Sequence, residues 1–467
     1  TFIMDGVRTR YVDPVYGSST NAGLYFATTD PLGPFSSLAQ AFTNLKYQDG
    51  EVLVKASNTS VVSPLGECSP EMNDGYGRAR TLKVRGYDIY STKHSTPTIF
   101  AGIIYPHGNW SQIGSTITFS TTCTQTLQPY GLYACNPEFL NLTRGQGGLP
   151  ALRRAASTSE VNSNAGNSGF YYLDTGSQLL YVSFPNSVTS YFASSGDIAF
   201  HTSNYSVQVV GGTELYLENL QVWGGIIVQY GGKLFLSNVE NYFSNASGVA
   251  GITVNNGGFV KGENVGIFYC ARDGINAHGN SRISLKNIQV AHVGSSYSDQ
   301  CLTAHEYSTV DIENGLFRDS KGQVICCING SKLWMDDFII DSCGTTLDAQ
   351  NLPLGGIDLD GETTAQLKNG VIRNCAVGLR VATRDANWRA DASIYLSNVD
   401  FIDNTVDIDA TSTKSEVTLA NCKYKTVAPD GGNFTTLNTR TVYVDNSGRA
   451  PVYDPNIWYL DPINGND

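Results

Sequence analysis

Methionine, charged residues and long helical patterns are all scarce in this sequence. Only 3 of its 467 residues are Met and only 15% are Asp, Glu, Lys or Arg, whereas Gly (48) and Tyr (26) are frequent. No long stretch repeats apolar residues at the spacing of an amphipathic helix. These absences argue against a helical bundle, and the composition is typical of an all-β protein with many turns.

Basic residues are also few, with 30 Lys and Arg against 42 Asp and Glu. The net charge of −12 disfavours nucleic acid or an anionic membrane as the main partner, although a local Arg cluster can still reverse the sign of one groove. No run reaches the roughly 18 to 20 apolar residues of a membrane span, so we expect no membrane insertion. No signal-peptide pattern begins at Thr1, and the sequence starts as if cut from something longer.

Metal and cofactor motifs are missing from the sequence. The ten Cys include no CxxC pair and no Cys/His spacing suited to zinc, and no compact acidic loop suits calcium. There is no phosphate-binding Gly loop, Gly-x-Ser-x-Gly motif or cofactor fingerprint, so we expect neither metal nor cofactor. Buried free thiols are favoured over disulfides because several cysteines lie in apolar, strand-like segments: Cys301, Cys326, Cys327, Cys343 and Cys375.

A repeated segment dominates the sequence from about residue 213. Nine segments align as an apolar alternation, a polar residue and then Asn, or Asp in one case, at spacings of 19 to 32 residues. Repeats of this length in a β-rich chain predict a solenoid, here a right-handed parallel β-helix of three-strand coils with at least eight coils in 213–425. The aligned residues are Asn219, Asn238, Asn264, Asn287, Asn314, Asp337, Asn369, Asn398 and Asn421.

The Asn column has a structural explanation. Asn tolerates the left-handed conformation of a tight bend, and stacked amides can form a hydrogen-bonded ladder from coil to coil. We therefore predict one interior ladder with no catalytic role.

A second strand follows in each unit and can be oriented by its period-two alternation. One set of positions is predicted to face the core: Ile252, Val254, Ile275, Ala277, Leu302, Ala304, Ile325, Cys327, Ile357, Leu359, Leu379 and Val381. The next position forms an outward column, in which neighbours from successive coils touch because coils lie about 4.8 Å apart. That column is Asn255, His278, His305, Ile328, Asp360 and Ala382.

The rest of the chain divides into three further regions. Residues 1–50 are an entry segment with a short amphipathic helix, formed by Phe35, Leu38, Ala39, Phe42 and Leu45, that is expected to cap the first coil. Residues 51–212 hold early coils and an irregular, loop-rich insertion at 105–205. In 426–467, the final WYLDPINGND echoes YVDPVYG at 11–17, so we expect the opening of a further module there.

Several short strings resemble the pectate-lyase-like β-helix superfamily, particularly phage tailspikes and capsule depolymerases. They are YVDPVYGSSTNAG with PFSSLAQAF, the stretch LPALRRAASTSEV to YVSFP, DGINAHG (273–279) and LTAHE (302–306). The last two are similar to an Asp-Gly-x-Asn-x-His and Thr-Ala-His-Asp/Glu pair in a subset of these proteins. The resemblance implies a polysaccharide substrate, glycosidic cleavage, a homotrimer and a place on a virion tail or outside the cell.

The candidate catalytic residues are Asp273, His278, His305 and Glu306, which we expect to converge in one surface groove. A glycosidase needs two carboxyl groups about 5 to 9.5 Å apart. A lyase needs a base and a group that neutralises a uronate. The alternative is a stacked polar pair of histidines on a solvated face, with Asp273 in an ordinary Asp-Gly turn and Glu306 a surface residue.

A second outward group can be read as a substrate-binding surface or as ordinary exposed charges. An Arg near an aromatic plane suits a sugar-binding groove. Asp299, in an insert at 294–300, could lie over the site. The group is Asp299, Asp358, Asp360, Arg380, Arg384 and Trp388.

Two functions fit this sequence. One is an endo-acting polysaccharide depolymerase, with hydrolysis favoured over elimination because no Lys or Arg directly neighbours the histidines. The other is an adhesin that binds a glycan in the same groove without cleaving it, since this scaffold hosts both kinds of protein.

Overall fold

The architecture is that of a computed structural model of the chain. It describes residues 8–24, 31–45, 48–55, 68, 80–87, 97–105, 107–113, 118–125, 131–134, 152–166, 169–184, 198–244, 249–294, 299–342, 355–381, 392–410, 416–425, 427–428 and 433–437. The sequence echo at 458–467, Arg384, Trp388, Ala382 and Cys343 lie outside these ranges.

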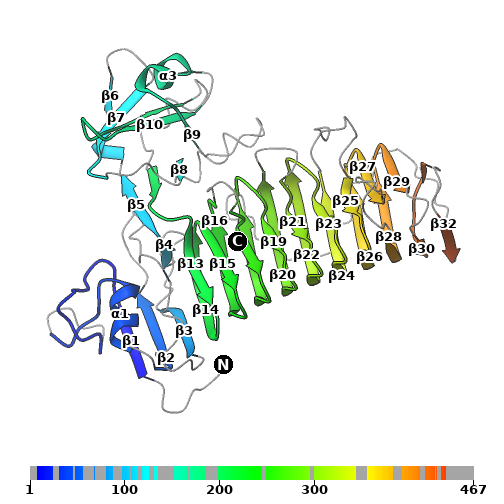
Figure 1. Cartoon of the computed structure of the whole chain (residues 1–467), viewed down its shortest axis with the longest axis horizontal. Helices are drawn as coiled ribbons and strands as arrows, with labels where there is room; N and C mark the ends of the chain where they lie inside the picture. Colours follow the sequence, from blue (N-terminus) through cyan, green and yellow to red (C-terminus); the bar gives the residue numbers. More distant parts are fainter. Residues whose placement is uncertain are drawn as a thin grey trace, which may run out of the picture.

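Two parallel sheets form the solenoid, and from residue 205 onward the chain passes alternately from one to the other (Figure 1). The short-strand sheet contains β13 (Tyr205–Val210), β15 (Gly225–Gln229), β17 (Ile252–Asn255), β19 (Ile275–Ala277), β21 (Leu302–Ala304), β23 (Ile325–Cys327), β25 (Gly355–Leu359), β27 (Val377–Val381), β29 (Val406–Ala410) and β31 (Val427–Ala428). Each of its strands pairs in parallel with the strand one coil away. Such crossovers are right-handed, and the predicted right-handed parallel β-helix is confirmed.

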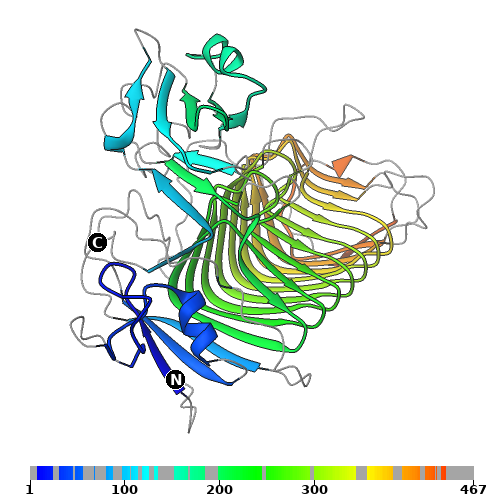
Figure 2. The same cartoon turned by 60° about the vertical axis from the view of Figure 1, so that its left-hand side comes forward.

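The long-strand sheet contains one long strand from each coil. Its strands are β1 (Arg8–Val12), β2 (Gly50–Lys55), β3 (Arg80–Tyr87), β14 (Thr213–Trp223), β16 (Lys233–Tyr242), β18 (Phe259–Phe268), β20 (Arg282–Val293), β22 (Thr309–Ser320), β24 (Lys332–Asp341), β26 (Thr364–Arg373), β28 (Ser393–Ile402), β30 (Glu416–Ala420) and β32 (Asn433–Leu437), with β4 (Thr98–Phe100) beside β14. Nine of them carry the repeat, so the predicted coil number is confirmed. Two of the three strands expected in each coil are one continuous strand that bends at the aligned Asn position (Figure 2).

The bend lies at the aligned Asn column. All nine residues from Asn219 to Asn421 are left-handed, with φ between 51° and 58°. The amides form the predicted ladder; for example, Asn287 Nδ2 donates to Asn264 Oδ1 at 3.0 Å. The ladder is not interior, however, because its side chains are half-buried or exposed. The bend resets the alternation, so Leu285 and Ile288 both enter the core and Asn287 stays outside.

The ladder gives a direct stability prediction. Asn287→Gly keeps the left-handed bend but loses the two hydrogen bonds of the Asn287 side-chain amide, each worth about 0.5–1.5 kcal/mol. Asn287→Ala should lower the free energy of unfolding by about a further 1–2 kcal/mol, because a Cβ is disfavoured in this conformation. Urea unfolding of both variants measures the difference. Equal losses of unfolding free energy would show that the left-handed conformation at residue 287 is not what Asn287 stabilises.

The core fills the space between the two sheets. Every short-strand residue predicted to face inward belongs to one apolar cluster with the long-strand side chains. The eight cysteines of the described part of the chain are buried free thiols, as expected.

Helix α1 (Leu38–Leu45) lies at the N-terminal end of the solenoid (Figure 1). Leu38, Phe42 and Leu45 pack into the shared core as predicted, and Ala41 joins them, whereas Ala39 is exposed. The helix therefore covers the first coil, as the amphipathic pattern predicts.

The insertion before the regular coils is more ordered than expected. It holds a five-stranded sheet and a three-stranded sheet with a short helix and its own apolar cluster, where the sequence suggested irregular structure. The elements are β5 (Gly102–Tyr105), η1 (His107–Asn109), β6 (Ser111–Gln112), β7 (Thr118–Thr122), β8 (Gly131–Ala134), β9 (Arg153–Arg154), α3 (Thr158–Ser163), β10 (Phe170–Asp174), β11 (Leu179–Ser183) and β12 (Ile198–His201). Its strands pair mostly antiparallel, unlike those of the solenoid.

Candidate functional site

His278 and His305 lie at the ends of the neighbouring strands β19 and β21. The backbone N–H of His278 donates to Val254 O and that of His305 to Ala277 O, both at 2.9 Å, so the two residues occupy one column. Their rings are stacked, with centroids 5.0 Å apart and planes 10° from parallel. The predicted histidine pair is therefore present on the outer side of the short-strand sheet.

Glu306 lies against both imidazoles. Its Oε2 is 3.7 Å from His278 Nδ1, and its Oε1 is 3.8 Å from His305 Nδ1. The Glu306 side chain is 55% exposed, against 30% for His278 and 24% for His305. An accessible carboxylate with two imidazole neighbours can accept or hold a proton at a bound ligand.

The protonation of His305 is shifted by its surroundings. Partial burial and the neighbouring His278 lower the pKa of His305 below 6.5, while the charge of Glu306 opposes the shift. His305 is therefore mainly neutral at pH 7 and can act as a hydrogen-bond acceptor or proton acceptor there.

Asp273 does not join these three side chains at the surface. It is only 9% exposed, and its carboxylate accepts the backbone N–H of Gln300 at 2.9 Å and Asn276 Nδ2 at 2.7 Å. The expected four-residue convergence is thus wrong for Asp273, because the turn before β19 directs its side chain onto the backbone of the next coil. Asn276, which donates a hydrogen bond to Asp273, faces outward in the same strand segment as His278.

Burial also changes the chemistry of Asp273. It raises the pKa of this carboxyl from 3.8 to about 6, the charge of Asp299 adds to the effect, and the hydrogen bonds from Gln300, Asn276 and Thr303 oppose it. A pKa near 6 is in the range that general acids use, but Asp273 at 9% exposure does not itself reach a ligand at the surface.

Four polar residues missed by the sequence reasoning extend this arrangement: Asn276, Gln300, Thr303 and Gln323. Thr303 pairs in register with Asn276 and donates from Oγ1 to Gln300 Oε1 at 2.7 Å. Gln300 Nε2 in turn donates to Gln323 Oε1 at 2.8 Å. Asn276 and Thr303 occupy outward period-two positions of their strands, so alternation could have found them. Gln300 comes from an insert without such a pattern.

The second predicted group is less accessible than expected. Asp299 is 1% exposed and its Oδ1 lies 3.0 Å from Arg272 Nη1, so it does not overhang the site as a surface acid. Asp358, Asp360 and Arg380 are 5%, 8% and 4% exposed, and Asp358 pairs in register with Arg380. These four charged side chains are therefore buried inside the protein. They form neither an exposed sugar-binding surface nor a set of ordinary surface charges.

The described part of the chain contains neither a metal-binding cluster nor a membrane-spanning helix. Among the residues that the structure describes, no group of three or more His, Cys, Asp or Glu side chains is arranged to hold a metal ion. No helix in those same ranges is long and apolar enough to cross a membrane.

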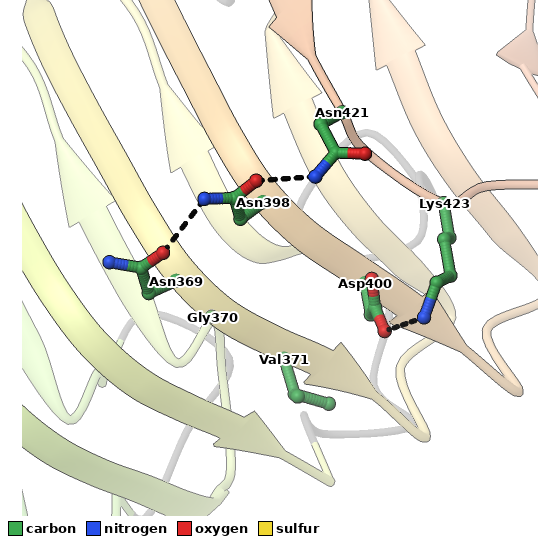
Figure 3. Close-up of a pocket in the computed structure, with 7 residues that line it drawn as sticks. All are labelled: Asn369, Gly370, Val371, Asn398, Asp400, Asn421 and Lys423. Atoms are coloured by element: carbon green, nitrogen blue, oxygen red, sulfur yellow. Dashed lines mark hydrogen bonds and ion pairs between the residues drawn. The ribbon is translucent and has the colours of Figure 1, made fainter. Parts of the chain in front are cut away.

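A hollow of about 370 Å³ lies elsewhere, along the bend of the last regular coils (Figure 3). The ladder amides of Asn369, Asn398 and Asn421 line it, together with Asp400, whose Oδ2 lies 2.7 Å from Lys423 Nζ. Asp400 is the single carboxylate among its lining residues and is already neutralised by Lys423. The hollow therefore offers no acid–base pair, and the histidine column remains the better catalytic candidate.

Comparison with known proteins finds structural similarity at low sequence identity. No family model and no curated protein matches the chain. A protein described as a glycoside hydrolase is 10% identical over 93% of this chain and 96% of its own, with a TM-score of 0.49. Pectate lyase Pel9A is 8% identical over 94% and 80%, with a TM-score of 0.40.

A viral protein, ORF18 of Geobacillus virus E2, is also similar. It is 12% identical over 49% of this chain and 52% of its own, with a TM-score of 0.33. With TM-scores below 0.5 for all three, we base the function on the residues of this chain.

Proposed function

We propose that this protein is a polysaccharide depolymerase that hydrolyses glycosidic bonds of a bacterial surface or capsular glycan. The observation that carries the proposal is the position of Glu306, an exposed carboxylate within 4 Å of two stacked imidazoles. Glu306 serves as base or nucleophile. His278 and His305 supply the second acid–base group, and the buried Asp273 positions Asn276, two residues before His278, through the 2.7 Å hydrogen bond from Asn276 Nδ2.

Hydrolysis is favoured over elimination by the charges of the site. A lyase acting on a uronate needs a cation beside the sugar carboxylate. Arg272 is paired with Asp299, and Arg380, three coils from His305, is buried in register with Asp358. The site itself presents the Glu306 carboxylate, which repels an acidic sugar. We propose further that the protein acts as a homotrimeric phage tailspike, on the sequence resemblance alone.

Incubation of the protein with a panel of purified bacterial capsular polysaccharides tests the activity. New reducing ends without ultraviolet-absorbing unsaturated products are expected for a hydrolase. Unsaturated ends would instead identify a lyase. The absence of products from every glycan that the protein binds would exclude the enzyme.

A non-catalytic adhesin is the second candidate. It is favoured by an aromatic strip on the outer face of the long-strand sheet, where the rings of Tyr216 and Phe235 stack at 4.3 Å and Phe259 adjoins them at 5.8 Å. Such a strip can bind apolar faces of a glycan without any acid–base group. Binding that survives loss of Glu306 but not of Phe235, with no products from any glycan, would support the adhesin.

A further inference from the structure

Six two-residue turns form a ridge along the helix axis. Each turn joins a short strand to the next long strand, and both of its residues are left-handed, with φ between 50° and 78°. Gly and Asn adopt this conformation readily, whereas other side chains do so at an energetic cost. The turns of this ridge are 230–231, 256–257, 279–280, 306–307, 329–330 and 361–362.

The turn at Glu306 and Tyr307 breaks the pattern of the ridge. Each of the other five turns contains at least one Gly, whereas this one has a carboxylate and an aromatic ring at φ 54° and 62°. Stacked backbone bonds hold the strained pair in place, with Asn280 N–H donating to Glu306 O and Tyr307 N–H to Asn329 O, both at 2.9 Å. Since Asn-Gly would form the same turn with less strain, the fold does not require these side chains, and such strain commonly marks a functional position.

The Tyr307 ring packs against the turn of the next coil and is otherwise largely exposed to solvent. A Cβ added to Gly330, in the turn of the next coil, would lie 2.5 Å from Tyr307 Cε1, so the ring rests on the bare backbone of that turn. Tyr307 is nevertheless 64% exposed. An aromatic ring that is fixed in place before binding loses little conformational freedom when a ligand stacks on it.

We propose that Tyr307 is a stacking platform for one pyranose of an uncharged glycan, which brings the neighbouring linkage to Glu306 and the histidine pair. This inference rests on the proposed function of the same site. The flat ring suits the C–H face of a pyranose. The adjacent Glu306 carboxylate, 55% exposed, disfavours an acidic sugar at this position.

Binding and stability measurements on four variants test the platform. The probe is the capsular polysaccharide that the protein binds most tightly in the panel, with binding measured in a Glu306→Gln background so that the glycan stays intact. Tyr307→Ala and Tyr307→Gly should each weaken binding about tenfold, while Tyr307→Phe keeps the ring and stays within about twofold. Tyr230→Ala is the matched control, because Tyr230 is 62% exposed in the same ridge but three coils away.

The thermal unfolding midpoint supplies a second readout. Tyr307→Gly should unfold at a higher temperature than Tyr307→Ala, since Gly relieves the left-handed strain, yet both should bind equally weakly. If Tyr307→Ala binds the glycan as tightly as the parent does, Tyr307 is not a stacking platform. The proposed function would still stand in that case. Failure of the parent protein to bind any glycan of the panel would overturn both.

Discussion

Glu306→Gln is expected to lower the rate of glycan cleavage by about 10²–10⁴-fold, the usual cost of losing an acid–base partner. The amide keeps the size and hydrogen-bonding reach of the side chain but cannot take up a proton or attack a sugar carbon. Its contacts to His278 Nδ1 and His305 Nδ1, 3.7 and 3.8 Å in the parent, are too long to be strong hydrogen bonds. Stability should therefore change little, and the loss should appear in kcat.

Glu313→Gln is the matched control for this variant. Glu313 is similarly exposed, at 60%, and contacts Lys286 Nζ at 2.6 Å on the long-strand sheet, away from the histidine column. Reducing-end assays on both variants should show loss of activity for Glu306→Gln alone. Full activity of Glu306→Gln on a confirmed substrate would place the catalytic groups elsewhere.

Asp273→Asn is expected to lose activity and gain stability above pH 6. Because Asn276 Nδ2 donates to the Asp273 carboxylate, the substitution should displace Asn276, two residues before His278, and lower kcat by up to about 10²-fold. Its pKa is raised from 3.8 to about 6 in the folded state, so its favourable contribution to folding is complete below pH 4 and is lost as the pH rises to 6. Asn stays neutral throughout, which removes a cost of about 3 kcal/mol at most, at 1.36 kcal/mol for each pKa unit.

The hydrogen bonds of Asp273 limit that gain but do not cancel it. In the Asp273→Asn variant, the new amide oxygen can still accept the N–H of Gln300, whereas the bond from Asn276 Nδ2 requires that amide to turn over. Denaturant unfolding at pH 4 and pH 8 measures the effect: the gain should appear at pH 8 and vanish at pH 4. An equal change in stability at pH 4 and at pH 8 would contradict the raised pKa.

Asp407→Asn is the control for Asp273→Asn. Asp407 is also a buried carboxylate, 2% exposed, and it accepts an Asn amide from Asn404 at 3.1 Å and the backbone N–H of Lys425 at 2.6 Å. It lies in β29, several coils from the histidines. Asp407→Asn should therefore leave cleavage unchanged, while Asp273→Asn lowers its rate.

Local patterns in the sequence predicted the solenoid because each coil repeats the same physical requirements. The period-two alternation placed pairs such as Ile275 and Ala277 in the core, and the left-handed preference of Asn located the bends. The same patterns could not say that the ladder lies outside the core. The direction in which Asn287 points depends on how the bend resets the alternation at Ile288, which is a property of the folded coil.

The candidate site divides in the same way. The sequence by itself determined that His278 and His305 share a column and that Glu306 adjoins them, because residues at equal positions of a repeat stack one coil apart. Only the tertiary structure decided that Asp273 is buried against Gln300 and that the ring of Tyr307 rests on Gly330. Burial and support of this kind come from neighbouring coils and inserts, whose distance and direction no local pattern encodes.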